Sequence, residues 1–377
     1  MRYYVIAGEV SGDKHASLVV RNIKKQEPNA VFRGFGGDCM QEEGVKLVRH
    51  IKDLAYMGFI EVILHLKTIL GNLKFCKQDI LDYNPDAICL TDYPGFNLRI
   101  AKFAHKHGIK VYYYVSPQVW AWKKGRIKTI GKVITKLFVI LPFEQEFYKK
   151  HNIEVEYYGN PLLDEVEEFK QKGENKEHFL KKYSLGDKPI VALLPGSRTQ
   201  EIKKMLPEQI KIVDKYKGRF DFVIAGVNTH SIDFYKSFIG NRNIRLTFNE
   251  TYNLLNVSSC AVVCSGTATL ETALFNVPQV VCYKTSLLSY LIAIYIVHIK
   301  HISLVNIIMK QEVIKELLQQ ECNANNLKKE FEKIAFNQEY INEIQNKYKQ
   351  LHTLLGSAGT SKNIAQYIVN DLLKSIN

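Results

Sequence analysis

The chain has 377 residues, 46% of them hydrophobic and 24% charged, which is the composition of a globular protein long enough for two domains. Its net charge of +13 favours anionic ligands, such as phosphates or an acidic membrane surface, although a generally basic proteome would give the same excess. No segment reaches the ~18 uninterrupted apolar residues of a transmembrane helix, and no signal peptide is expected before the first predicted strand.

The first part of the chain alternates short apolar runs with helical patterns. Strands are predicted at Tyr3–Ala7, Ala30–Gly34, Ala87–Leu90, Lys110–Val115 and Leu137–Ile140. Helices are predicted near residues 14–26, 61–82, 97–107 and 123–132. Short β-rich runs separated by amphipathic helices predict a doubly wound parallel sheet.

A polar, charge-dense stretch from Glu165 to Lys182 is interpreted as a linker, after which the alternation restarts. Strands are predicted at Ile190–Leu194, Phe220–Ala225, Ile244–Thr247, Ala261–Cys264 and Gln279–Tyr283. Helices are predicted near 200–216, 231–239, 251–257, 269–275, 311–320, 325–352 and 364–376. The expected domains are 1–163 and 164–345, both α/β, with C-terminal helices at 346–377 that pack back toward the first domain.

Three strand-to-helix turns combine glycine with hydroxyl or charged residues. They are Ala7-Gly8-Glu9-Val10-Ser11-Gly12-Asp13, Leu194-Pro195-Gly196-Ser197-Arg198 and Cys264-Ser265-Gly266-Thr267-Ala268-Thr269-Leu270-Glu271. A buried strand that ends in such a turn and then opens a helix leaves a nest of backbone N–H groups, which favours phosphate or another anion. The turns therefore predict two α/β domains facing across a cleft that takes a phosphate-bearing substrate.

Asp92 follows an apolar strand in the segment Leu90-Thr91-Asp92-Tyr93-Pro94-Gly95-Phe96-Asn97. Ligands of open α/β sheets bind outside the carboxyl ends of the strands, so a carboxylate there is a candidate general base. The alternative is a structural role, as an N-cap or Asx-turn for the helix predicted to begin near Asn97.

Two charged residues follow strands of the second domain. The Arg198 guanidinium suits bidentate contact with phosphate, or alternatively a surface ion pair with Glu201. Glu271 lies one helical turn beyond Thr267, where a carboxylate can accept hydrogen bonds from a ribose diol. The alternative for Glu271 is an anion that stabilises the first turn of a helix.

Two further segments carry candidate substrate contacts. Glu9 and Asp13 flank the first glycine turn, as candidates for catalysis or as helix-stabilising anions. The segment Ser116-Pro117-Gln118-Val119-Trp120-Ala121-Trp122 holds both tryptophans of the chain, next to Lys123, Lys124 and Arg126. Sugar stacking or a membrane-interface role suits this segment, and so does a simple packing corner.

Two apolar stretches allow a membrane interpretation. Ile60–Ile80 is amphipathic, with one side formed by Ile63, Leu66, Leu70 and Leu73. Leu287–Ile299 is nearly all apolar and is flanked by Lys284 and Lys300. Leu287–Ile299 is too short to span a bilayer, and neither stretch is interpreted as spanning one. Both suit the membrane interface or acyl chains, and the alternative for each is a buried core helix.

Several motifs are absent from the sequence. It contains no D-x-D pair of the kind that holds a metal–diphosphate, no G-x-x-x-x-G-K-[ST] loop and no G-x-S-x-G elbow. The seven cysteines form no C-x-x-C pair, and several lie in apolar strands, so they are interpreted as reduced core residues of a cytosolic protein. We therefore expect neither a metal site nor a cofactor.

Taken as an ordered set, the motifs resemble the lipid-A-disaccharide synthases. The matching segments are Ala7–Asp13, Met57-Gly58, Asp92–Asn97, Tyr114–Trp122, Leu141-Pro142-Phe143-Glu144, Leu194–Arg198, Ser265–Glu271, Ser303-Leu304-Val305-Asn306 and Glu316-Leu317-Leu318-Gln319. Each motif is weak alone, but the order is right and the matches run from residue 7 to about residue 320. The set is therefore specific.

The resemblance implies a two-domain glycosyltransferase B fold and an inverting, metal-independent transfer. The donor would be UDP-2,3-diacylglucosamine and the acceptor 2,3-diacylglucosamine 1-phosphate, or lipid X. The products would be a β-1,6-linked tetraacyl disaccharide 1-phosphate and UDP. The family works on the cytoplasmic face of the inner membrane of Gram-negative bacteria, so we expect a peripheral protein on an anionic surface, without nucleic acid. The sequence leaves a homodimer open.

The resemblance also implies roles for individual residues. Asp92 would be the catalytic base. The donor site would consist of Gly196, Ser197, Arg198, Ser265, Gly266, Thr267, Glu271 and Asn306. Further substrate contacts would come from Glu9, Ser11, Asp13, Asn97, Gln118 and Trp120.

The sequence departs from the family pattern at three positions. Many members have Asp where Gly95 stands, His where Asn160 stands and Pro where Val305 stands, so no role is assigned to these positions. Two other functions stay open: another UDP-sugar enzyme of the same fold, such as an epimerase or a different glycosyltransferase, and a non-catalytic protein that binds nucleotide or lipid.

Overall fold

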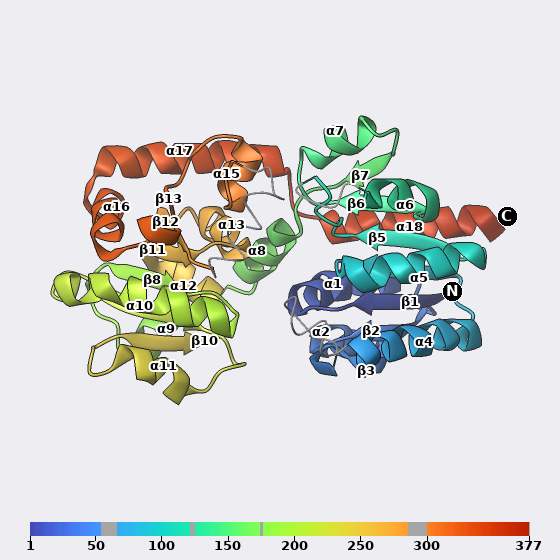
Figure 1. Ribbon diagram of the computed structural model, residues 1–377, viewed down its shortest axis with the longest axis horizontal. Coiled ribbons are helices and arrows are strands. Elements are labelled where there is room, and N and C mark those ends of the chain that lie inside the picture. The colour runs from blue at the N-terminus through green and yellow to red at the C-terminus, as the bar shows by residue number, and fades with distance from the viewer. Residues whose placement is uncertain (54–65, 121–124, 174–175, 286–299, 377) are drawn as a thin grey trace. The chain divides into compact units, whose positions relative to one another are not determined.

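The computed structural model describes residues 1–53, 66–120, 125–173, 176–285 and 300–376. The chain forms two compact units, each with its own sheet (Figure 1). Unit 1 comprises Met1–Asp164 with Gly356–Asn377, and unit 2 comprises Glu165–Leu355. No helix within the described ranges combines the length and the apolar character that crossing a bilayer requires.

Unit 1 is built on a parallel sheet of seven described strands. They are β1 (Arg2–Ala7), β2 (Val31–Gly36), β3 (Lys46–His50), β4 (Ala87–Thr91), β5 (Lys110–Tyr114), β6 (Lys136–Val139) and β7 (Val155–Tyr157). Their order is β3-β2-β1-β4-β5-β6-β7. The winding reverses between β1 and β4, and ligands of such sheets bind beyond the carboxyl ends of the strands at that switch point.

Helices cover both faces of this sheet. Those within the described ranges are α1 (Val10–Gln26), α2 (Asp38–Glu42), α4 (Leu66–Tyr83), α5 (Pro94–Lys106), α6 (Arg126–Val133), α7 (Glu144–Lys149) and α18 (Thr360–Ile376), with a 3-10 turn, η1 (Ile51–Asp53). Residues of β1 alternate between two cores, because successive side chains of a strand point to opposite faces. Tyr4 and Ile6 pack with α4, α5 and α6, whereas Tyr3 and Val5 pack with α1 and α18.

The last helix belongs to unit 1 although the chain reaches it from unit 2. Figure 1 shows α18, in red, among the blue and cyan elements of unit 1. Asp164 caps its N-terminus, since the carboxylate accepts backbone N–H bonds from Gly359, Thr360 and Ser361 at 2.6, 3.1 and 2.9 Å. Asp164 lies on α8 (Pro161–Gln171), the helix by which the chain leaves unit 1.

Unit 2 repeats the plan with six described parallel strands. They are β8 (Ile190–Leu194), β9 (Asp221–Gly226), β10 (Arg245–Phe248), β11 (Ser258–Cys264), β12 (Gln279–Tyr283) and β13 (Glu316–Leu318). The order is β10-β9-β8-β11-β12-β13, so its switch point lies between β8 and β11. The fold class predicted from the sequence, two doubly wound parallel sheets, is confirmed.

The described helices of unit 2 are α9 (Lys176–Lys182), α10 (Thr199–Tyr216), α11 (Ile232–Ile239), α12 (Thr251–Val257), α13 (Thr267–Leu274), α15 (Leu304–Met309), α16 (Ala324–Phe336) and α17 (Gln338–Leu355), with a 3-10 turn, η2 (Gln319–Glu321). Ala192 and Leu194 of β8 pack with α9 and α12. Helices α10 and α16 contact each other and also β11 and β12.

Two predicted elements are wrong. The helix predicted at 311–320 contains β13 instead, whose residues pair with Val281–Tyr283 of β12. The stretch interpreted as a linker, Glu165–Lys182, is helical and is occupied by most of α8 and by α9. Proline at the first position of α8 and the Asn160 side chain, which accepts from Leu162 N at 3.0 Å, favour a helix start there.

Candidate active site

The carboxyl ends of β4 and β5 carry an unusual backbone. Asp92, Tyr93 and Val115 have positive φ values of 46°, 49° and 59°. Residues other than glycine rarely adopt this left-handed backbone conformation, and for a β-branched residue such as valine it is a clear outlier. Such strain persists only where surrounding structure enforces it, and it clusters at functional sites.

The turn at Asp92 is held by two buried side chains. The Asp92 carbonyl accepts from the Tyr113 hydroxyl at 2.5 Å and from Asn97 Nδ2 at 2.7 Å. Asn97 also donates to the Thr91 carbonyl at 3.2 Å, and its side chain is fully buried. Asn97, predicted as a substrate contact, is thus engaged in fixing the backbone around Asp92.

The Asp92 carboxyl is largely withdrawn from water. Burial raises its pKa above the usual value, while the backbone N–H of Tyr93 and the charge of His15 act in the opposite direction. His15 is buried on α1, with its ring 6.2 Å from that of Tyr114. Sequence reasoning missed His15, since nothing in its spacing relates it to Asp92.

The first glycine turn, which follows β1, lies beside the turn at Asp92. Ala7 of β1 pairs with Thr91 of β4, so the turns that follow the two strands are neighbours. A Cβ atom at Gly8 would lie 2.3 Å from the Tyr93 ring, and this position therefore requires glycine. Glu9 is partly buried at the start of α1, and Ser11 is exposed.

Asp13 has a structural environment. Its carboxylate accepts backbone N–H bonds from Gly37 at 2.6 Å, Cys39 at 3.0 Å and Met40 at 3.3 Å. The residue is only 2% exposed. It therefore stabilises the N-terminus of α2, which agrees with the structural alternative rather than with substrate contact.

A second buried carboxyl, that of Glu144, lies at the start of α7, the helix that follows β6. Glu144 accepts from the backbone N–H groups of Ile140 and Leu141 at 3.1 and 2.9 Å. Burial raises its pKa to about 7, although these N–H groups and the neighbouring Ser116 and Trp120 side chains lower it. Glu144 was part of a family motif but was not predicted as a functional residue.

The tryptophan segment is partly described. The Trp120 ring packs edge-to-face on Phe143, with centroids 5.1 Å apart, which supports the packing alternative. Gln118 is exposed and remains accessible to a ligand. Residues 121–124, and with them Trp122, lie outside the described residues.

In unit 2 an internal carboxylate occupies the predicted anion nest. The backbone N–H groups of Ser197 and Arg198 donate to Glu201 Oε2 at 3.2 and 3.3 Å. Arg198 Nη1 lies 3.5 Å from Glu201 Oε1, and its side chain is 60% exposed. Gly196 has a φ of +104°, and a Cβ there would lie 2.6 Å from Glu201 Oε2. The structure thus shows the alternative predicted for Arg198, the ion pair with Glu201, and Glu201 also closes the capping box of α10. The Arg198 side chain is still largely exposed.

The third turn joins β11 to α13. Gly266 and Thr267 are exposed, and the Ser265 hydroxyl donates to the Ile302 carbonyl at 3.0 Å. Glu271, one turn into α13, accepts from the Tyr252 hydroxyl at 2.9 Å. Tyr252 had no sequence signal, because it precedes Glu271 by 19 residues on a different helix.

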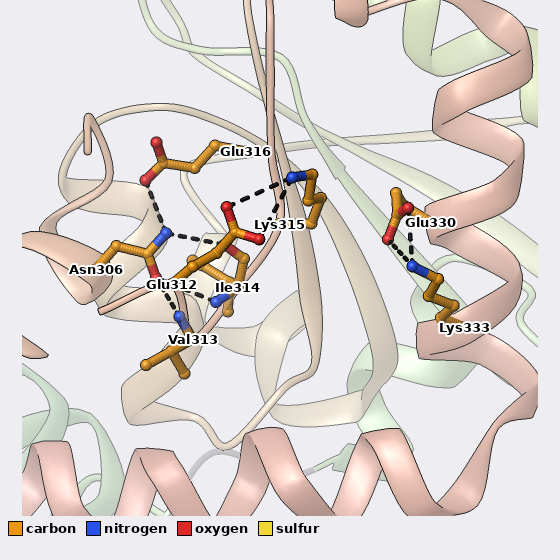
Figure 2. A network of polar contacts seen from close by, with 8 residues as sticks. All are labelled: Asn306, Glu312, Val313, Ile314, Lys315, Glu316, Glu330 and Lys333. Carbon is orange, nitrogen blue, oxygen red and sulfur yellow. Dashed lines mark hydrogen bonds and ion pairs between the residues drawn. The ribbon is translucent and has the colours of Figure 1, made fainter. Parts of the chain in front are cut away.

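Asn306 is fully buried in a network that uses both ends of its amide (Figure 2). Nδ2 donates to the Ile314 carbonyl and to Glu316 Oε1, each at 2.8 Å. Oδ1 accepts from the backbone N–H groups of Val313 at 2.7 Å and Ile314 at 3.1 Å. Asn306, predicted as a donor contact, therefore fixes the chain that leads into β13.

The Glu316 carboxylate extends this network toward the third turn. It accepts from the backbone N–H groups of Ile302 and Ser303 at 3.0 and 2.9 Å, and from the Ser303 hydroxyl at 2.7 Å. Because the Ile302 carbonyl in turn accepts from Ser265, two hydrogen bonds connect Glu316 to the Ser265 turn, and a third connects Asn306 to Glu316.

The three departures from the family pattern have different surroundings. Gly95 is exposed, and no atom of the described residues lies within 4 Å of a Cβ added there, so a longer residue would fit. Asn160 is buried, and its Nδ2 donates to the Ile140 carbonyl at 3.0 Å. Val305 is fully buried in α15.

The apolar stretch that ends in α4 divides between surface and core. Leu70 is 53% exposed, whereas Leu73, Cys76 and Ile80 are buried against the sheet. The core alternative therefore holds for Leu73, and Leu70 keeps the exposed position. Ile63, Met57-Gly58 and the whole of Leu287–Ile299 lie outside the described residues.

Comparisons with known proteins give the same family over nearly the full length of the chain. A family model described as lipid-A-disaccharide synthetase matches residues 3–370. The lipid-A-disaccharide synthase of Syntrophus aciditrophicus is 37% identical over 378 residues, which cover 98% of each chain. That of Geobacter sulfurreducens is 32% identical over 381 residues, covering 100% of this chain and 98% of its own.

Solved structures agree on the architecture. The UDP-GlcNAc 2-epimerase of Neisseria meningitidis, bound to UDP-GlcNAc, aligns with a TM-score of 0.69 at 13% identity, covering 99% of this chain and 100% of its own. A glycosyltransferase of Rickettsia africae aligns with a TM-score of 0.57 at 15% identity, covering 99% and 98%. At such identities the likeness shows the fold alone, and the family match decides among the functions left open. The chain belongs to the lipid-A-disaccharide synthase family, the glycosyltransferases that act in lipid A biosynthesis.

Proposed function

We propose that this glycosyltransferase moves 2,3-diacylglucosamine from UDP-2,3-diacylglucosamine to the 6-hydroxyl of lipid X, with Asp92 as general base. The family supports the two substrates. The observation that carries the assignment of Asp92 is its carboxyl group, desolvated enough for the pKa to rise, on a strained turn at the switch point of unit 1. A raised pKa brings a base closer to the operating pH, which favours proton removal.

In the proposed step the Asp92 carboxylate takes the proton of the acceptor hydroxyl while the hydroxyl oxygen attacks the anomeric carbon of the donor sugar. The bond between that carbon and the UDP oxygen breaks, and its electron pair leaves with UDP. Attack from the face opposite UDP inverts the anomeric configuration and gives the β-1,6 linkage. General base catalysis of this kind contributes roughly 10²–10⁴-fold to the rate.

The charge that develops on UDP would be stabilised in unit 2. Arg198, the N–H groups that follow Gly196, and the N-terminus of α13 at Ser265, Gly266 and Thr267 supply donors and positive charge. Glu201 accepts from Ser197 and Arg198, so the diphosphate would take the place of its carboxylate. Glu271 would accept hydrogen bonds from the ribose diol.

The burial of the remaining predicted residues separates two kinds of role. Glu9, Ser11, Gln118 and Trp120 stay proposed contacts of the substrates, because their side chains are exposed or half-buried. For the fully buried Asn97 and Asn306, and for Asp13, we propose positioning roles only: their polar atoms hold the turns from which the contacts project.

Product analysis tests this function directly. Purified protein is incubated with detergent-solubilised UDP-2,3-diacylglucosamine and lipid X, and the products are measured by mass spectrometry. We expect a tetraacyl disaccharide 1-phosphate and an equal amount of UDP, with UDP release that depends on lipid X. Equal UDP release without lipid X, or the absence of the disaccharide, would contradict the proposal.

We further propose that the protein binds the cytoplasmic face of the inner membrane peripherally, by charge and by apolar side chains of α4. The net charge is +13, and Leu70 is exposed between the exposed Lys67 and Lys74. Salt screens charge attraction beyond about 8–10 Å but leaves apolar insertion intact. High salt should therefore release only part of the protein from anionic vesicles, and detergent the rest.

The pair Leu70→Ser and Leu73→Ser separates membrane contact from packing. Leu70→Ser should weaken vesicle binding and leave the thermal midpoint of unfolding nearly unchanged, whereas substitution of Leu73, which is 5% exposed, should lower that midpoint. Unchanged vesicle binding in Leu70→Ser would remove α4 from the proposed surface. We also propose a homodimer, which sedimentation of the protein in detergent would test by measuring its mass.

A further inference from the structure

Two aromatic rings of unit 2, those of Phe169 and Phe275, fix the position of the ring of Tyr252. Its ring lies edge-to-face to Phe169 of α8, with centroids 5.7 Å apart and an interplanar angle of 89°. It lies 5.2 Å from Phe275, which directly follows α13, and the two phenylalanine rings are 5.5 Å from each other. Each ring thus contacts the other two, and packing from three helical segments leaves the Tyr252 ring little freedom.

The hydroxyl of this fixed ring points at two carboxylates. It donates to Glu271 Oε1 at 2.9 Å and lies 3.1 Å from Glu165 Oε2. Burial, followed by the charges of Glu271 and Glu165, raises the pKa of Tyr252 far above that of a free phenol. The hydroxyl therefore keeps its proton throughout the physiological pH range and remains a hydrogen-bond donor to a carboxylate.

We propose that Tyr252 is a positioning residue that orients the Glu271 carboxylate toward the ribose hydroxyls of the sugar nucleotide. This inference rests on the assignment of Glu271 to the ribose in the proposed function. An ionised carboxylate accepts about four hydrogen bonds, so the bond from Tyr252 leaves acceptor capacity for a diol. Without the hydroxyl, the carboxylate loses this one fixed donor, and binding must then supply the ordering that Tyr252 now provides.

The test compares two nucleotides that differ only at the ribose. UDP and 2′,3′-dideoxyuridine 5′-diphosphate are titrated calorimetrically into the full chain and into Tyr252→Phe, Glu271→Gln and the double variant. Phenylalanine keeps the ring and its packing and removes only the hydroxyl. Tyr216→Phe is the matched control, because the Tyr216 hydroxyl also donates to a glutamate of unit 2, Glu332.

The unchanged chain should bind UDP about 10–100-fold more tightly than the dideoxy nucleotide, since hydrogen bonds to a charged acceptor are strong. Tyr252→Phe should weaken UDP binding about three- to tenfold and change binding of the dideoxy nucleotide less than about twofold. The double variant should bind UDP no more weakly than Glu271→Gln. In turnover, Tyr252→Phe should raise the KM for the donor with little change in kcat, and Tyr216→Phe should change neither.

Each other outcome identifies what fails. If Glu271→Gln removes the preference for UDP but Tyr252→Phe leaves it intact, the positioning role is wrong and the ribose assignment stands. Equal weakening of both nucleotides in Tyr252→Phe, or additive losses in the double variant, would also overturn the positioning role. If Glu271→Gln keeps the full preference for UDP, the ribose assignment is wrong, and the inference about Tyr252 falls with it.

Discussion

Both sheets reverse their strand order at a switch point, but the side chains that follow the strands there differ in charge. Beyond β4 in unit 1, the Asp92 carboxyl is desolvated, with a raised pKa, on a backbone in the left-handed region. Beyond β8 in unit 2, Arg198 is 60% exposed, and the N–H groups after Gly196 hold the carboxylate of Glu201. The same topology thus suits proton removal at one edge and anion binding at the other, because different side chains follow the strands.

The largest expected effect concerns the edge of unit 1. Asp92→Asn keeps the size of the side chain but removes its ability to take a proton, so kcat should fall roughly 10²–10⁴-fold. Asp82→Asn, which changes an exposed carboxylate on α4, is the control and should turn over normally. If Asp92→Asn retains more than about a tenth of the rate, the base is another group.

The Glu144→Gln substitution tests whether the buried Glu144 carboxyl of unit 1 makes the free energy of unfolding depend on pH. The pKa of Glu144 is raised from 4.5 to about 7 by burial. Between these values the folded protein holds a proton that the unfolded chain has lost. The free energy of unfolding should therefore fall as pH rises through this window, by roughly 3 kcal/mol in total.

Urea unfolding at about pH 5 and at about pH 8 measures this contribution. Glu144→Gln should be more stable than the unchanged chain at the higher pH and should lose most of the difference at the lower pH. Glu146→Gln changes an exposed carboxylate of the same helix and should not alter the pH dependence. If the Glu144→Gln variant is less stable than the unchanged chain at both pH values, the claim that ionisation of Glu144 destabilises the folded protein is wrong.

In unit 2, removing a charge should strengthen binding. Glu201→Gln keeps an oxygen that can cap α10 but frees Arg198 and removes the anion from the nest, so UDP should bind about two- to fivefold more tightly. Glu312→Gln breaks a comparable ion pair with Lys315 (Figure 2) and should leave UDP affinity unchanged. Weaker UDP binding in Glu201→Gln would mean that the diphosphate does not compete with this carboxylate.

Chelation should have the smallest effect, namely none. The sequence lacks a D-x-D pair, and Arg198 with the N–H groups of unit 2 supplies donors for the diphosphate. UDP release should therefore be the same with and without EDTA. Activity that is lost in EDTA and returns with Mg²⁺ or Mn²⁺ would show that the edge of unit 2 needs a metal.

Much of this architecture was predictable because the central strands are continuous apolar runs. The residues that follow those runs, including Asp92, Gly196 and Ser265, could be placed at the carboxyl edges of sheets from the apolar pattern alone. The edge strands β3, β7 and β13 were not predicted. β7 and β13 have only three residues each, and β3 carries three basic residues among its five. Pairing on one side only permits such polar residues, which break the apolar pattern, so β13 was mistaken for a helix.

The sequence could not predict which polar side chains are buried or which groups they contact. Asn97 and Asn306 matched a functional motif, yet both are fully buried and hold backbone groups. Asp13 likewise became a cap for α2. Tyr252 and Glu271 meet because α12 and α13 pack around shared aromatic rings, a tertiary contact that no local pattern encodes.

The central claim, a base on unit 1 and an anion site on unit 2, is tested most directly by measuring the UDP dissociation constant of Asp92→Asn and Arg198→Ala by calorimetry beside their kcat. The account predicts that Asp92→Asn binds UDP as the unchanged chain does but hardly turns over. It predicts that Arg198→Ala binds UDP about tenfold or more weakly, while Arg242→Ala, which loses an exposed pair with Asp214, binds normally. Weakened UDP binding in Asp92→Asn, or unchanged binding in Arg198→Ala, would contradict this division of roles.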